Sequence, residues 1–100
     1  MTNRAKAQKI YNETDPDRGF LDMLKREIRD NEGCDEKYVL NNLLTNYIHE
    51  DVNNVISLLE AIGEYCNSDT TFSEYTNLVG SLATEYECSD LSSLFTEIYR

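Results

Sequence analysis

The chain has 100 residues, 40% of them hydrophobic, and a formal net charge of −10 at pH 7. This length predicts one acidic helical domain over residues 1–100, and the apolar content excludes a wholly disordered chain. The sequence contains no apolar run near the roughly 20 residues that cross a bilayer, and no apolar signal segment. We therefore expect a cytoplasmic protein with no membrane partner.

The apolar residues recur with a helical period along most of the chain. This pattern predicts an all-α fold, a compact bundle of about five or six short helices. A basic opening helix is expected from Thr2 to Tyr11, where Ala5 and Ile10 form a weak apolar face. Because this face is weak, residues 1–14 are expected to pack loosely on the rest of the bundle.

The second and third helices are predicted from their capping residues. A helix is expected after Asp15 and Pro16, since an Asp side chain caps free amides and Pro suits the first helical position. Asn31 and Gly33 are expected to end it. The third helix is expected to start after Asp35 as its N-cap, with apolar positions at Leu40, Leu43, Leu44, Tyr47 and Ile48.

The fourth helix has the clearest apolar stripe, which follows one side of about four turns. The stripe comprises Val52, Val55, Ile56, Leu59, Ile62 and Cys66. For the fifth helix, Thr71 with Glu74 three residues later matches a capping box. A short sixth helix is expected after Ser89 and Asp90, both of which are favoured N-caps.

The basic residues lie within the first 37 residues and at Arg100, so none stands between Tyr38 and Tyr99. A surface with one sign of charge repels itself and attracts positively charged partners. This stretch therefore predicts a basic partner, although negative charge also serves solubility alone. Its carboxylates are Glu50, Asp51, Glu60, Glu64, Asp69, Glu74, Glu85, Glu87, Asp90 and Glu97.

Several glutamates stand where negative charge weakens a helix. Glu60 and Glu64 are one turn apart, a like-charge pair that costs about 0.2–0.5 kcal/mol. Glu64, Glu85, Glu87 and Glu97 fall near the C-terminal ends of expected helices. There the helix dipole disfavours each carboxylate by about 0.3–1 kcal/mol. A sequence selected only for folding would carry Lys at such positions, so we interpret these glutamates as part of a binding surface.

The expected partner-binding residues combine this acidic surface with one tyrosine. Tyrosine is enriched at protein interfaces because it offers apolar area with a polar tip. Tyr75 and Tyr86 lie on the expected apolar stripe and are more typical of a core. The expected partner-binding set is Glu60, Glu64, Tyr65, Glu74, Glu85 and Glu87.

No catalytic residue, metal or cofactor is expected. The single histidine, His49, is typical of a solvated loop, with a proton-transfer role as the alternative. Cys34, Cys66 and Cys88 fit neither a disulfide framework nor a metal-ligand spacing, so they are expected to be reduced. The glycines are isolated, which argues against a phosphate-binding loop. The basic residues are interleaved with acidic ones, so direct binding of nucleic acid is not expected.

In size, acidity and helical character, residues 38–99 resemble the small phage-encoded nucleic-acid mimics that block restriction or CRISPR enzymes. The resemblance is compositional and includes no motif. It implies a non-enzymatic protein, a monomer or a homodimer, that binds and inhibits a basic, nucleic-acid-binding enzyme as an anti-restriction or anti-CRISPR protein. Immunity proteins that neutralise basic nuclease toxins are similar for the same physical reason, and a structural or scaffold subunit is a further alternative.

Overall fold

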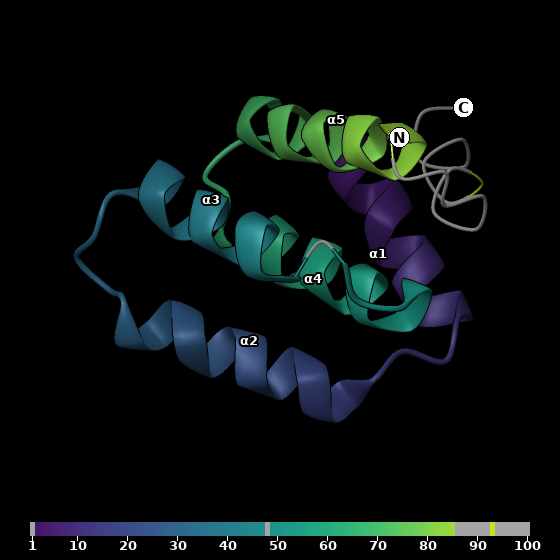
Figure 1. Ribbon diagram of the computed structural model, residues 1–100, viewed down its shortest axis with the longest axis horizontal. Helices are drawn as coiled ribbons and strands as arrows, with labels where there is room; N and C mark the ends of the chain where they lie inside the picture. Colours follow the sequence, from purple (N-terminus) through teal and green to yellow (C-terminus); the bar gives the residue numbers. More distant parts are fainter. Residues whose placement is uncertain (1, 48, 86–92, 94–100) are drawn as a thin grey trace.

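The computed structural model describes residues 2–47, 49–85 and 93. Within these residues the chain forms α-helices and no strand, which confirms the all-α prediction (Figure 1). The short helix expected after Ser89 and Asp90 lies outside the described residues. The helices in this part of the chain are α1 (Asn3–Glu13), α2 (Arg18–Asp30), α3 (Glu36–Tyr47), α4 (Val52–Tyr65) and α5 (Asp69–Glu85).

Aspartate side chains cap three of these helices. Asp35 accepts hydrogen bonds from the amides of Lys37 and Tyr38 at 3.0 and 3.3 Å, which confirms it as the cap of α3. Asp51 caps α4 in the same way. For α2 the predicted cap was wrong by two residues, because Asp17 rather than Asp15 is the N-cap.

The start of α5 also differs from the prediction. The helix begins at Asp69, and the Ser68 hydroxyl accepts a hydrogen bond from the Thr71 amide at 3.2 Å. Thr71 therefore lies inside the first turn, and the expected capping box with Glu74 is wrong. The reason is that Ser68, a favoured N-cap residue, supplies the capping oxygen one turn earlier.

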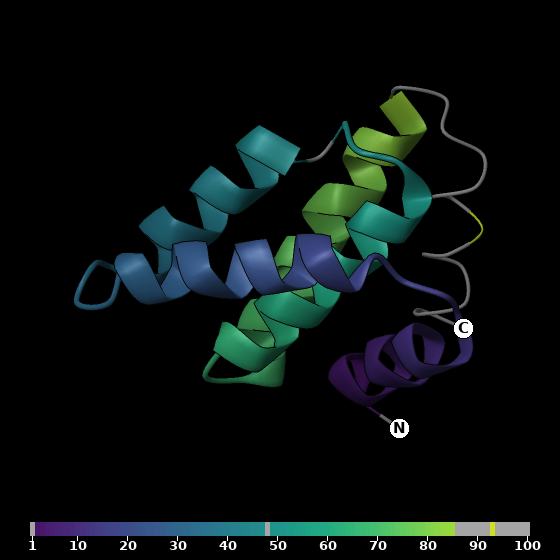
Figure 2. The same cartoon turned by 90° about the horizontal axis from the view of Figure 1, so that it is seen from below.

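The fourth helix lies at the centre of the molecule. In Figure 1 it runs between α5 at the top and α2 at the bottom, and Figure 2 shows α2 crossing over it. It packs against each of the other four helices. Every residue from Val55 to Ile62 is buried, so α4 is covered on all sides rather than along one stripe.

The core extends from α4 into every other helix. Tyr11 is 2% exposed and, with Ala7, fixes α1 on this core, whereas Ala5 is exposed and Ile10 is half-buried. The apolar face of α1 is therefore rotated from the one expected from the sequence. The other helices contribute Leu21, Leu24, Val39, Leu40, Leu43, Leu44, Phe72, Tyr75 and Val79.

Candidate functional site

The residues of the expected partner-binding set do not share one surface. Glu64, Glu74 and Glu85 are exposed, and Tyr65 is half-buried. Glu60 is only 7% exposed, because it lies on the central helix. The expectation that Glu60 and Glu64 form one exposed acidic pair therefore differs from the structure, and Glu87 lies outside the described residues.

Glu60 borders a cavity of about 240 Å³ between α1, α4 and α5. With its amide oriented to donate, the Gln8 nitrogen lies 2.7 Å from both carboxylate oxygens of Glu60. Burial raises the pKa of Glu60, and the charge and hydrogen bonding of Glu64 raise it further, against opposing effects of Lys25 and Gln8. Glu60 thus links α4 to α1 inside the bundle and is not available as part of an outer acidic face.

Glu64 is paired with a base from the N-terminal region. The Lys25 ammonium lies 3.0 Å from one carboxylate oxygen of Glu64 and 3.2 Å from the other. This contact joins α2 to α4 across a long stretch of sequence. The folded structure therefore places the basic side chain of Lys25 beside a carboxylate of the stretch from Tyr38 to Tyr99, which has no Lys or Arg of its own.

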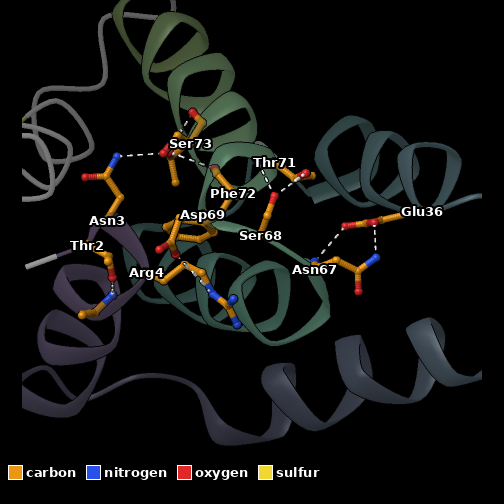
Figure 3. Close-up of polar contacts among 12 residues, drawn as sticks. Thr2, Asn3, Arg4, Glu36, Asn67, Ser68, Asp69, Thr71, Phe72 and Ser73 are labelled. Atoms are coloured by element: carbon orange, nitrogen blue, oxygen red, sulfur yellow. Dashed lines mark hydrogen bonds and ion pairs between the residues drawn. The ribbon is translucent and has the colours of Figure 1, made fainter.

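A second contact of this kind ties α1 to the start of α5. Arg4 lies 3.9 Å from Asp69, and the Asn3 amide donates to the Ser73 hydroxyl at 3.0 Å (Figure 3). Beside them, the Asn67 amide donates to Glu36 at 2.8 Å. The carboxylates at this end of the bundle thus act in holding helices together.

Tyr65 borders an open groove of about 270 Å³ between α2 and α4. Burial raises the pKa of its hydroxyl, and nearby acidic groups that include Glu36 add to this. The other lining residues carry both signs of charge, and the lining comprises Lys25, Ile28, Arg29, Glu32, Ala61, Glu64 and Tyr65. Because the groove is not uniformly acidic, a role for Tyr65 in binding a basic partner stays a prediction.

The outward face of α5 has a different character. Glu74 and Glu85 are exposed there, and Leu78 between them is 44% exposed. Next to Leu78 is an open cavity of about 240 Å³ between α3 and α5. The helix contains no Lys or Arg. Among the described residues, this face therefore combines carboxylates that have no ion-pair partner with an exposed apolar side chain.

The groups that could support catalysis differ in their exposure to solvent. His49 is exposed beside the start of α4, Cys34 is exposed, and Cys66 is buried. Burial is the main cause that raises the pKa of the Cys66 thiol to about 12, which disfavours the reactive thiolate. Of the residues that the structure describes, no His, Cys or Ser lines the cavity at Glu60. Among the described residues, no cluster of His, Cys, Asp or Glu has an arrangement able to hold a metal ion.

Four residues of these surfaces did not enter the expected set. Arg4, Gln8 and Lys25 lie far along the chain from the carboxylates they contact, so no local pattern indicates them. Leu78 could have been found from the sequence, since it is an apolar residue that lies beside the apolar stripe of Tyr75 and Val79 and not on it.

Comparisons of this chain with protein-family models, with curated proteins and with solved structures found no match. In the part of the chain that the structure describes, no helix has both the length and the apolar character to cross a membrane. Function is therefore inferred from the charges, cavities and exposed faces of the molecule.

Proposed function

We propose that this chain is a non-enzymatic protein that binds a basic, nucleic-acid-binding enzyme and inhibits it by occupying its phosphate-binding surface. The observation that carries the proposal is the outward face of α5. Glu74 and Glu85 are exposed about three helical turns apart, and α5 contains no basic residue. Such a face attracts a positively charged groove and repels nucleic acid itself.

The internal contacts decide which carboxylates are available to a partner. Lys25 offsets the charge of Glu64, Arg4 lies near Asp69, and Glu60 is buried. The proposed binding surface therefore lies on α5 rather than on α4. In the described part of the chain, Glu74 and Glu85 have no ion-pair partner within 4.0 Å.

The spacing of these carboxylates limits the form that mimicry can take. Residues three turns apart on a helix are roughly 16 Å apart, which is wider than the spacing of phosphates along a strand. The proposed mimicry is therefore one of negative potential and not of a regular row of phosphates. At physiological salt such attraction acts over about 8 Å, so the carboxylates must approach the partner closely.

The test is affinity capture of the partner from a lysate of the cell in which the chain is expressed, at low and at high salt. Proteins that elute between the two salt concentrations would be identified by mass spectrometry. We expect a basic, nucleic-acid-binding enzyme, because electrostatic association weakens steeply with salt. With that enzyme purified, the chain should inhibit its activity, and a nucleic-acid oligomer should displace the chain.

Two results would contradict the proposal. One is a partner that stays equally bound at both salt concentrations, and the other is a partner whose activity the chain does not change. A captured nuclease toxin that is inhibited would assign the chain to the immunity class instead of the phage mimics. A salt-resistant assembly with an acidic protein would favour a structural subunit.

A further inference from the structure

We infer that the outward face of α5 docks a basic segment of the partner that also carries an apolar side chain, with Leu78 as the apolar anchor. This inference rests on the proposed function and specifies the chemistry of its contact surface. Leu78 lies four residues after Glu74 and seven before Glu85, so the three side chains share one face of the helix. An apolar residue is thus flanked on both sides by carboxylates.

The exposure of Leu78 distinguishes it from the other apolar residues of α5. Phe72, Tyr75 and Val79 are at most 5% exposed, whereas Leu78 is 44% exposed. A single exposed leucine is common on protein surfaces. Here it stands beside a cavity and between two charges of the same sign, so an apolar centre has a polar rim, as protein interfaces do.

The cavity next to Leu78 gives the apolar side chain of a partner a place to enter. Its volume is about 240 Å³, and Lys37, Asn41, Glu74 and Tyr75 complete its lining. The Tyr75 hydroxyl donates a hydrogen bond to the Lys37 carbonyl at 3.1 Å, which fixes one wall. Because the wall is held by this bond and by burial of the ring, the recess is already formed before a partner arrives.

Charge decides between the occupants of this face. A second copy of the chain would bring a net charge of −10 against another −10, and nucleic acid would be repelled in the same way. A basic segment is attracted to Glu74 and Glu85. Lys37 stands on the α3 side of the cavity, so the basic residues of the partner are placed over α5 and away from α3.

The experiment titrates the full-length, isotope-labelled chain with two synthetic peptides of equal length and equal positive charge. One alternates lysine with leucine and the other alternates lysine with serine. We expect the lysine–leucine peptide to bind more tightly and to shift the amide resonances of residues 74–85. In the variant Leu78→Ser its affinity should fall about tenfold, because the burial of a leucine side chain is lost.

A matched control is Met23→Ser on α2, where the methionine is 38% exposed. This variant should bind the lysine–leucine peptide as the unmodified chain does. Resonance shifts confined to other helices, or equal effects of the two variants, would overturn the inference. So would concentration-dependent shifts of residues 74–85 without peptide, which would indicate self-association.

The result also separates this inference from the proposed function. If both peptides bind equally, in a salt-dependent way, at carboxylates outside α5, the docking surface is wrong while a basic partner remains supported. If neither peptide binds even at low salt, both the inference and the proposal of a basic partner fail.

Discussion

The N-terminal region, with α1, α2 and the first residues of α3, carries charges of both signs, whereas residues 38–85, with the rest of α3 and with α4 and α5, contain no Lys or Arg. The folded molecule does not keep these regions apart. Lys25 and Arg4 of the N-terminal region lie next to Glu64 and Asp69 of the acidic region. Packing thus neutralises part of the negative charge of the acidic region. It does so at Glu64 and Asp69 but not at every carboxylate of that region.

The outward faces of α2 and α5 show where the difference remains. Each has one exposed large apolar side chain, Met23 and Leu78 respectively. Around Met23 stand Asp22 and the basic Arg26, while the helix of Leu78 carries carboxylates and no base. Exposure of an apolar side chain is therefore common to both helices, and the contact surface that we propose on α5 rests on the acidic surroundings of Leu78.

The largest expected change in the free energy of unfolding tests whether the mixed-charge N-terminal region and the acidic region unfold together. Leu58 is fully buried on α4, the helix that packs against all the others in the described part of the chain. Leu58→Ala should lower the free energy of unfolding by about 2–5 kcal/mol, because it leaves a cavity in the shared core. Urea denaturation followed by circular dichroism measures this, and one transition is expected.

The matched control is Leu78→Ala, at an exposed position, which should change the free energy of unfolding by less than about 0.5 kcal/mol. Two separate transitions in Leu58→Ala would show that the mixed-charge and acidic regions are independent units. That outcome would contradict the role of α4 as their common core.

A smaller effect concerns the acidic residue that is buried against the N-terminal region. Glu60→Gln keeps the shape of the side chain and removes its charge, and we expect it to raise the free energy of unfolding at pH 7 by about 1 kcal/mol. Burial raises the pKa of Glu60 in the folded protein above its unfolded value. Proton binding by Glu60 therefore adds to the free energy of unfolding. This contribution is complete below the pKa that Glu60 has in the unfolded chain, and it is lost as the pH rises through the higher pKa of the folded protein.

In the unmodified chain, this loss contributes a decline of stability with rising pH, and Glu60→Gln should remove that part. Denaturation at a series of pH values measures the difference. Glu74→Gln, at an exposed carboxylate of α5, is the control and should leave the difference in place. A Glu60→Gln variant that is destabilised at pH 7 would contradict the assigned effect of burial.

The smallest effect concerns the basic residue that crosses to the acidic region. Lys25→Gln should lower the free energy of unfolding by about 0.5 kcal/mol, since both side chains of the pair are partly exposed to solvent. The effect should shrink at high salt. Arg26→Gln, the next position on α2, is the control, and equal losses in both variants would show that the contact with Glu64 adds no stability.

Much of the fold could be predicted from local features of the sequence. The period of the apolar residues predicted the described helices, and the predicted cap at Asp35 lies where aspartate chemistry favours it. The error at Asp15 arose because Asp17 also precedes a helical run. At the start of α5, Ser68 and Thr71 both offer a capping oxygen, and in the structure the Ser68 hydroxyl accepts the hydrogen bond from the Thr71 amide.

The candidate surface could be predicted only in part. The sequence indicated Glu74 and Glu85, and the structure places both on an exposed face. It also indicated Glu60, which the structure buries. The apolar stripe on one side of α4 does not show that other helices also cover the remaining sides. The burial of Glu60 could therefore not be predicted from its position on the helix.

By itself, the sequence determined the helical character of this protein and the stretch from Tyr38 to Tyr99 that has carboxylates but no Lys or Arg, because period and charge are local properties of the chain. Only the tertiary structure decided which carboxylates are buried, which are paired and which face solvent. The physical reason is that Gln8, Lys25 and Arg4 reach their partners through packing across long stretches of chain.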